Sequence, residues 1–374
     1  MKEKLTIINQ DSGYLMIDIA NAYAKSGYEV SLICGRLVER NTPLNPGIKL
    51  DKICKYRRSN IPIRLYSWFW GTLQIIFKVW FKYRKNHLFI VSNPPFAPLI
   101  PIVCKNTFSL LIYDVYIEKP KDLPLIRRLS FLSSLWVKAH KRVLKRAEKI
   151  FTLTEGMKNI IAQYSGGNTV DIVPIWTDSD FLKPIPPDKN PFIREHQLEG
   201  KFIVLYSGNI GTKGGLETLI QVASLVKNRK IKFVIIGDGA RKSFLADKIQ
   251  KLKLTNCMLL PWQDVNVLPN SLASANLAVA SLVASSSKGA IPSKLFNYMS
   301  VGAPILGLAD LDSDLAKLIK SLSIGKCFTH DSSNEIAEYI NYLANNAEEC
   351  KTLSARSLSG SKNYTSRTAE MFLA

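Results

Sequence analysis

The chain alternates between short apolar runs and longer stretches in which apolar residues recur every three or four positions. The first pattern predicts buried β-strands and the second predicts amphipathic helices. The predicted strands are 5–9, 30–34, 88–92, 109–115, 149–154, 170–174, 202–207, 232–236, 257–260, 277–280 and 305–308. The predicted helices are 14–26, one that ends at 144–147, 157–164, 215–226, 242–252 and 293–300.

This strand–helix alternation predicts parallel sheets covered by helices on both faces. Two such series follow one another, and 374 residues are too many for one ordinary core. The sequence therefore predicts an α/β protein of two doubly wound domains. Four prolines interrupt any regular element in 181–191, so we expect the domains to be 1–185 and 186–356.

Residues 61–83 depart from this pattern because they are apolar on nearly every side and contain three tryptophans. Their length fits a membrane span, but Arg64, Lys78 and Lys82 make spanning unfavourable. Two interpretations stay open. The segment is either a buried helix of the first domain or a helix in the membrane interface, anchored by tryptophans and basic residues.

The net charge of +20 favours an anionic partner, and it is concentrated in the first half of the chain. Residues 119–149 hold ten basic and two acidic residues. We expect a membrane surface as partner, contacted through 61–83 and 125–149. Nucleic acid is not predicted, because no helix-turn-helix, RNP or zinc-finger pattern accompanies the charge.

The six cysteines are scattered and form no C-x-x-C pair, so neither a disulfide framework nor a zinc site is expected. The N-terminus shows no signal-peptide pattern, and a cytoplasmic location is predicted. The acidic strings 178–180 and 312–314 fall in loops, and no metal ligand is predicted among them.

Three predicted turns point to phosphate chemistry. The strand 202–207 leads into the glycine-rich loop 208–215, and 237–239 follows the next strand. In 290–304, a lysine stands at the start of a predicted helix. Because the carboxyl ends of parallel strands meet at one edge of a sheet, these turns are expected to form one site. Glycine-rich backbone together with a lysine favours an anion, which predicts a nucleotide diphosphate.

The ordered set of short motifs in these turns resembles family-4 glycosyltransferases of the GT-B fold. The motifs are Tyr-Ser-Gly-Asn-Ile-Gly (206–211), Gly-Leu-Glu (215–217), Ile-Gly-Asp-Gly (236–239), Ile-Pro-Ser-Lys (291–294) and Tyr-Met-Ser-Val-Gly-Ala-Pro (298–304), with 92–95, 114–118, 153–158 and 173–178 in the first half. The resemblance implies two facing Rossmann-like domains with a cleft between them, and a final helix, 357–374, that crosses back to the first domain. Capsule and O-antigen sugar transferases are the most similar members.

The resemblance also implies roles for individual residues. Lys294, Lys213 and Asp114 would be catalytic, and Ser12, Gly13 and Glu118 would bind the acceptor. The expected donor-binding residues are Gly208, Asn209, Gly211, Gly237, Asp238, Gly239, Ile291, Pro292, Ser293 and Asn297. No metal or cofactor is expected, because lysines and backbone dipoles would neutralise the leaving diphosphate.

Four positions depart from the family pattern. Two glutamates are usual eight residues apart, and here Gly289 and Asn297 take their places. Tyr113 stands where a histidine is common, and Lys213 lies one residue early. Asn297 retains the capacity to hydrogen-bond ribose as a neutral amide.

The resemblance implies a retaining enzyme that uses a UDP-linked sugar as co-substrate. Its acceptor would be a polyprenyl-diphosphate-linked saccharide of a surface polysaccharide, at the inner face of the cell membrane. A non-catalytic partner subunit of another transferase is an alternative, which the missing glutamates permit. A UDP-sugar epimerase is a second alternative, although it would need general acid and base groups and no basic amphipathic segments.

Overall fold

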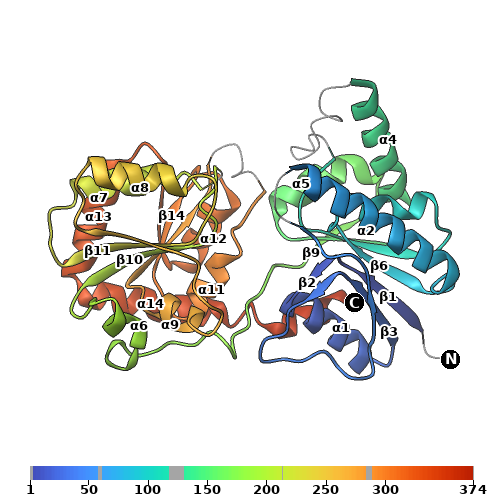
Figure 1. Ribbon diagram of the computed structural model, residues 1–374, viewed down its shortest axis with the longest axis horizontal. Coiled ribbons are helices and arrows are strands. Elements are labelled where there is room, and N and C mark those ends of the chain that lie inside the picture. Colours follow the sequence, from blue (N-terminus) through green and yellow to red (C-terminus); the bar gives the residue numbers. More distant parts are fainter. Residues whose placement is uncertain (1–2, 58–60, 118–129, 213, 284–288, 374) are drawn as a thin grey trace. The chain divides into compact units, whose positions relative to one another are not determined.

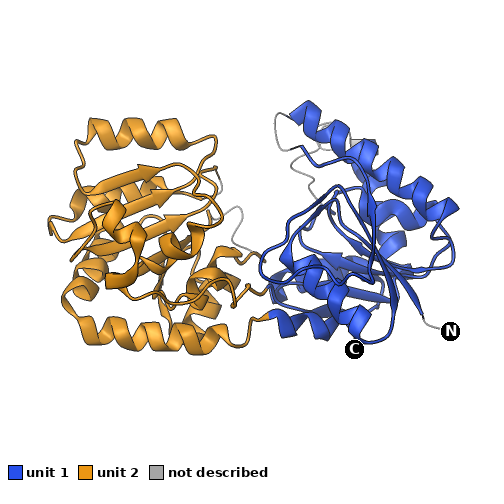
Figure 2. Ribbon diagram, turned by 60° about the horizontal axis from the view of Figure 1, so that its bottom comes forward, with its two compact units in different colours: residues 1–175, 366–374 blue, residues 176–365 orange. Residues whose placement is uncertain are grey.

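The computed structural model describes residues 3–57, 61–117, 130–212, 214–283 and 289–373. The chain forms two compact units (Figure 2). Unit 1 comprises residues 1–175 and 366–374, and unit 2 comprises 176–365. The dividing point, between Ile175 and Trp176, precedes the proline-rich stretch, so that stretch belongs to unit 2.

Unit 1 is built on a seven-stranded sheet in which all neighbouring strands are parallel (Figure 1). In sheet order the strands are β5 (Lys49–Lys52), β3 (Glu29–Cys34), β1 (Lys4–Ile8), β6 (His87–Val91), β7 (Phe108–Ile112), β8 (Lys149–Thr152) and β9 (Val170–Ile172). Two short strands, β2 (Asp11–Ser12) and β4 (Arg36–Leu37), pair separately. The central strands are buried because they are apolar on both faces.

Helices on both faces complete unit 1. They are α1 (Tyr14–Lys25), α2 (Ile61–Phe81), η1 (Ala97–Ile102), α4 (Ser130–Arg146), α5 (Glu155–Ser165) and the 3₁₀ helix η3 (Ser366–Phe372). The end of the chain is part of this core. The Tyr23 hydroxyl donates to the Phe372 carbonyl at 2.7 Å, and the Phe372 ring packs edge-on against Phe89 and Phe151.

Unit 2 is built on a six-stranded parallel sheet. In sheet order its strands are β12 (Cys257–Leu260), β11 (Ile231–Ile236), β10 (Phe202–Ser207), β13 (Leu277–Ser281), β14 (Ile305–Leu308) and β15 (Gly325–Phe328). The chain order reverses between β10 and β13. At such a switch point the loops diverge and leave space for a ligand.

Nine helical segments cover the described part of this sheet. They are η2 (Pro187–Lys189), α6 (Pro191–Glu195), α7 (Glu217–Leu225), α8 (Lys242–Lys251), α9 (Leu268–Ala273), α11 (Lys294–Ser300), α12 (Asp314–Leu322), α13 (Ser333–Asn345) and α14 (Ala347–Ser361). The stretch 357–374 therefore begins within α14 and ends in η3 of unit 1.

The predicted fold class of two doubly wound, parallel α/β domains is confirmed. Most predicted strands lie within three residues of the observed bounds. Strands β5 and β15 escaped prediction because Lys49–Lys52 and Gly325–Phe328 are short and carry lysines. Both are edge strands, where one side of the strand is open and polar residues are tolerated.

Candidate functional site

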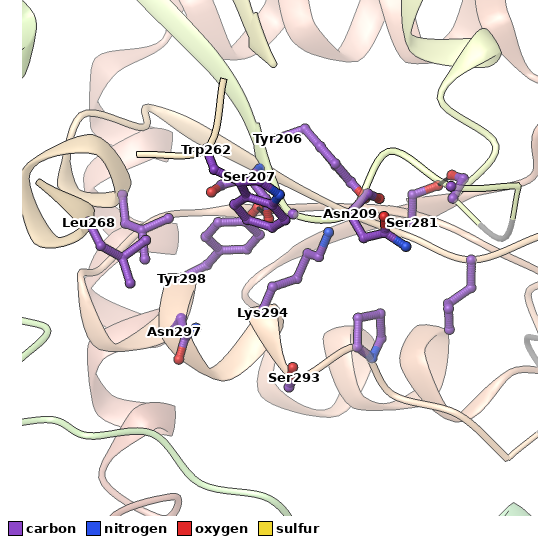
Figure 3. A pocket seen from close by; sticks show the side chains of 16 residues that line it. Tyr206, Ser207, Asn209, Trp262, Leu268, Ser281, Ser293, Lys294, Asn297 and Tyr298 are labelled. Carbon is purple, nitrogen blue, oxygen red and sulfur yellow. Dashed lines mark hydrogen bonds between the residues drawn. The ribbon is translucent and has the colours of Figure 1, made fainter. Parts of the chain in front are cut away.

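Unit 2 contains a cavity of about 430 Å³ at the carboxyl ends of β10 and β13 (Figure 3). It lies at the switch point of the sheet, where parallel α/β folds place their ligands. The lining residues are Tyr206, Ser207, Gly208, Asn209, Gly211, Gly214, Trp262, Leu268, Leu272, Ser281, Leu282, Pro292, Ser293, Lys294, Asn297 and Tyr298. Six predicted donor-binding residues thus converge here, namely Gly208, Asn209, Gly211, Pro292, Ser293 and Asn297, together with Lys294, which was predicted to be catalytic.

The loop after β10 presents backbone donors to this cavity. The Tyr206 hydroxyl donates to the Asn209 carbonyl at 2.8 Å and holds the loop in a tight turn. Within the part of the chain that the structure describes, the N–H groups of Asn209 and Gly211 have no backbone acceptor. Unpaired N–H groups on a glycine-rich loop are donors suited to an anionic oxygen.

Three further predicted donor-site residues, Gly237, Asp238 and Gly239, support this loop from behind. A Cβ on Gly237 would overlap the Gly208 carbonyl, and one on Gly239 would overlap that of Ile210. The Ile210 N–H donates to the Asp238 carbonyl at 2.8 Å. These residues are not among those that line the cavity, and neither is Ile291. The glycines are required because the turn after β11 packs directly on the turn after β10.

Lys294 is the one charged side chain among the described residues that line the cavity. Its Nζ lies 3.6 Å from the centre of the Tyr206 ring, and a Cβ on Gly208 would overlap it. Lys294 forms no ion pair or hydrogen bond with any described residue. Burial lowers its pKa to about 7. An unpaired, partly desolvated ammonium attracts an anion more strongly than an exposed lysine would.

Tyr298 fixes the helix that carries Lys294. Its hydroxyl accepts from the Ser207 N–H at 2.8 Å and donates to the Ser207 carbonyl at 3.2 Å, which joins α11 to the end of β10. The N–H groups of Leu295 and Phe296 donate to Pro292 and Ser293. Two N–H groups at the start of α11 are therefore engaged, and the attraction for an anion rests on the ammonium and the loop.

Asn297 lies one turn after Lys294 and contacts a distant part of the chain. The Thr177 hydroxyl donates to Asn297 Oδ1 at 2.7 Å. The other atypical position, Gly289, has φ of +75°. A glutamate there would strain the backbone, because this conformation favours glycine.

The sequence analysis did not identify Trp262, Leu268 and Leu272 as lining residues. Trp262 follows β12 and is 55% exposed, although it borders the cavity. A large aromatic side chain directly after a predicted strand was the signal that could have revealed it. Leu268 and Leu272 lie on α9, whose position relative to the cavity depends on tertiary packing.

Unit 1 contains the predicted residues Asp114, Ser12 and Gly13. Asp114 lines a cavity of only about 20 Å³, where Tyr116 donates to its carboxylate at 3.4 Å and His140 lies nearby. Burial lowers the pKa of His140 to about 4. Ser12 is buried and donates to the Asn9 carbonyl at 3.0 Å, and Gly13 precedes α1.

Some predictions fall on segments outside the described residues. These are Lys213, Glu118, part of 125–149 and most of the loop that precedes Gly289. In the remainder of the chain, no group of three or more His, Cys, Asp and Glu side chains is placed to hold a metal ion.

Unit 1 carries an apolar–basic surface on α2, η1 and α4. Its exposed apolar residues are Ile61, Ile63, Tyr66, Phe69, Trp70, Phe77, Trp80, Phe81, Ile102, Val103, Phe131 and Leu135. The same helices carry Arg64, Lys138, Lys141, Arg142, Lys145 and Arg146. Lys78 on α2 and Lys82 just after it pair instead with Asp51, at 2.5 and 2.6 Å. Trp80 Nε1 donates to the Val103 carbonyl at 3.0 Å, which joins α2 to η1.

Helix α2 combines features of both interpretations of 61–83. Ser67, Trp68, Gly71, Ile75 and Val79 are buried against unit 1, and the opposite face is exposed. None of the helices that the structure describes combines the length and hydrophobicity needed for a transmembrane segment.

The cavity lies in the part of the chain that matches a known sequence family. The sequence model described as "Glycosyl transferases group 1" matches residues 188–358. "Probable glycosyltransferase WbjE" of Pseudomonas aeruginosa is 24% identical over 234 residues, 61% of this chain and 57% of that protein. "Putative colanic acid biosynthesis glycosyl transferase WcaI" of Escherichia coli K12 is 28% identical over 193 residues, 50% and 47% of the two chains. The chain thus spans about half the length of these relatives.

Solved structures resemble the whole chain. HepE of Anabaena, solved in complex with UDP, gives a TM-score of 0.72 at 14% identity, and the alignment covers 99% of this chain and 98% of HepE. At this level of identity the likeness concerns the fold. The predicted GT-B fold, with parallel sheets in two Rossmann-like domains, is confirmed.

Proposed function

Because residues 188–358 belong to the glycosyl transferases group 1, we propose that this protein transfers a sugar from a nucleotide diphosphate sugar to a saccharide acceptor. We infer further that the donor is UDP-linked, that transfer occurs with retention, and that the acceptor is a lipid-linked oligosaccharide of a surface polysaccharide.

One observation carries the donor assignment. The unpaired ammonium of Lys294 lies over the loop whose Asn209 and Gly211 N–H groups point to no backbone acceptor among the described residues. A diphosphate satisfies all three donors at once. Its sugar and nucleoside need an elongated space, and about 430 Å³ is within the usual size of ligand cavities. The UDP complex of HepE supports the choice of a uridine nucleotide.

The same groups provide the chemistry of transfer. As the bond between the anomeric carbon and the phosphate oxygen breaks, negative charge develops on the leaving diphosphate. Lys294 and the loop N–H groups are fixed near that charge before the reaction, so little reorganisation is needed. Since burial lowers the pKa of Lys294 to about 7, a bound diphosphate is expected to raise it and keep the lysine protonated.

A membrane-bound acceptor is supported by unit 1. The aromatic residues of the apolar–basic surface suit the headgroup region of a bilayer, and the adjacent lysines and arginines suit anionic lipids. We propose peripheral attachment to the inner face of the cell membrane. The name of the colanic acid relative supports a role in polysaccharide synthesis.

A donor panel tests this proposal. Purified protein is incubated with UDP-, GDP-, ADP- and dTDP-sugars, with and without a polyprenyl-diphosphate-linked saccharide, and nucleotide release is measured. We expect release from one or a few donors, accelerated at least tenfold by the acceptor. NMR of the product reports retention, and a repeat in EDTA tests independence from metal.

The alternatives predict different results. A sugar epimerase would convert the donor without acceptor or nucleotide release. It is disfavoured because no carboxylate is among the described lining residues to move protons. A non-catalytic partner subunit would bind nucleotide without turnover. Failure to bind any nucleoside diphosphate would contradict our proposal.

A further inference from the structure

We propose that the donor site recognises the pentose of the nucleotide without requiring its 2′-hydroxyl, so that 2′-deoxynucleoside diphosphates bind about as well as ribonucleoside diphosphates. This inference rests on the proposed function, because it assumes that the diphosphate lies at Lys294. It concerns Asn297, which lies three residues after Lys294 on α11.

Helix geometry places Asn297 beside the pentose. Side chains three residues apart lie on the same helical face, about 5–6 Å apart. The pentose follows the diphosphate at a similar separation, through the 5′-oxygen. We place the nucleoside on the side of Asn297, so that with the diphosphate at Lys294 the pentose lies next to this amide, which lines the cavity.

Thr177 determines which atoms of that amide are available. Thr177 is fully buried, and its N–H donates to the Tyr364 carbonyl at 3.1 Å. Its hydroxyl proton needs an acceptor, and in the described structure Asn297 Oδ1 is the partner, at 2.7 Å. The amide oxygen is thereby turned toward Thr177, and one of its two acceptor positions is used. The Nδ2 group has no hydrogen-bond partner among the described residues and remains a donor.

The described residues that line the cavity include no carboxylate that could accept from a pentose diol. Residues 202–216 and 265–309 include neither Asp nor Glu. Asp264, just outside the second range, accepts the Asn266 N–H at 3.1 Å. Recognition from these walls therefore relies on neutral groups.

The contribution of the 2′-hydroxyl to binding depends on whether a carboxylate or a neutral amide contacts the pentose. A carboxylate accepting from both hydroxyls of ribose would lose a partner in a deoxynucleotide, and an unpaired desolvated charge is costly. An amide N–H needs only one acceptor oxygen. The 3′-oxygen or the ring oxygen supplies it in both kinds of nucleotide.

Titration calorimetry with UDP and 2′-deoxy-UDP on the full chain tests the inference. We expect dissociation constants within about threefold of each other. The variant Asn297→Glu places a carboxylate beside the pentose and is expected to favour UDP over 2′-deoxy-UDP by about tenfold or more. The wild-type comparison decides the matter even if this variant does not fold.

The outcomes separate the two proposals. Tight binding of UDP together with at least tenfold weaker binding of 2′-deoxy-UDP by the wild type would overturn the inference and leave the proposed function intact. If UDP, 2′-deoxy-UDP, ADP and GDP all fail to bind, the proposed function falls, and the inference falls with it. Thr177→Val frees the amide to rotate and should weaken both nucleotides, whereas Thr177→Ser should restore wild-type affinity.

Discussion

The six strands of the unit 2 sheet follow the same order as the first six strands of unit 1, yet the central strands of the two units end differently. Strand β1 of unit 1 and β10 of unit 2 occupy equivalent positions in the strand order. After β1, the fully buried Gln10 side chain fills the edge and donates to the Ser67 carbonyl at 2.8 Å. After β10, Gly208 leaves the edge open, and the Lys294 ammonium occupies part of that space.

The difference shows that the fold provides the location of a site and that the residues at the strand ends decide whether one forms. In unit 1 the buried Gln10 joins the segment after β1 to α2, the helix whose outer face is apolar and basic. In unit 2 a glycine, Gly208, follows β10 directly, and the cavity with its backbone donors lies beside it. The candidate functional feature of unit 1 is thus the apolar–basic surface, and that of unit 2 is the cavity at Lys294.

The largest effect is expected from Lys294→Met, which removes the ammonium and keeps the bulk of the side chain. Turnover should fall by about 10²–10³-fold, because a preorganised charge is lost where the leaving group becomes negative. The measurement is steady-state transfer with the donor identified in the panel. A loss below about fivefold would mean that another group neutralises the diphosphate.

The same variant provides a folding control. It is expected to unfold at or above the wild-type temperature, because it removes a buried ammonium that has no partner. The pKa of Lys294 is about 7 when folded and about 10.4 when unfolded, so its unfavourable effect is present below pH 7. That effect diminishes as the pH rises from 7 toward 10.4.

Gly208→Ala tests the opening at the end of β10. The added Cβ would displace the Lys294 ammonium, and nucleotide affinity should fall by about 30-fold, measured by titration calorimetry. The matched control in unit 1 is Gly13→Ala, where a Cβ would meet only the Val38 carbonyl at 3.9 Å. Equal affinity losses in both variants would show that the comparison between the two strand ends is incorrect.

The pH dependence of nucleotide binding tests the charge of Lys294. Above pH 7 the Lys294 side chain is largely deprotonated in the absence of an anion, so binding a diphosphate requires uptake of a proton. The dissociation constant of UDP is expected to rise up to about tenfold per pH unit between pH 7.5 and 8.5. Lys294→Met should give a flat profile over the same range, and a flat wild-type profile would contradict this assignment.

Trp262→Ala tests whether the exposed indole beside the cavity stacks on the nucleobase. Base–aromatic stacking contributes about 1–3 kcal/mol, so UDP should bind about tenfold more weakly. Quenching of tryptophan fluorescence by UDP should decrease in this variant. Phe244→Ala, on α8 and outside the lining residues, serves as the control and should bind UDP normally.

The smallest effect is expected on the unit 1 surface. Phe77 and Phe81 are 54% and 83% exposed, and replacing both by alanine should reduce binding to vesicles with 30% anionic lipid severalfold. The basic residues of α2 and α4 are expected to provide the affinity for the vesicles that remains. Tyr342→Ala, a 52% exposed aromatic of unit 2, is the matched control. Unchanged flotation of the double variant would exclude these rings from membrane contact.

The sequence by itself determined most of the strands, the parallel sheets, the glycine-rich loop at 208–211 and the lysine at 294. These features are local, because strand and helix periods and turn residues are set by neighbours along the chain. The family pattern also identified the two atypical positions, Gly289 and Asn297.

Only the tertiary structure decided which groups meet in the cavity. The contact between Thr177 and Asn297 joins residues 120 positions apart, and Trp262 reaches the site from a third segment. The lowered pKa of Lys294 depends on its burial beside Tyr206. Such pairings follow from sheet order and loop packing, and no local periodicity encodes them.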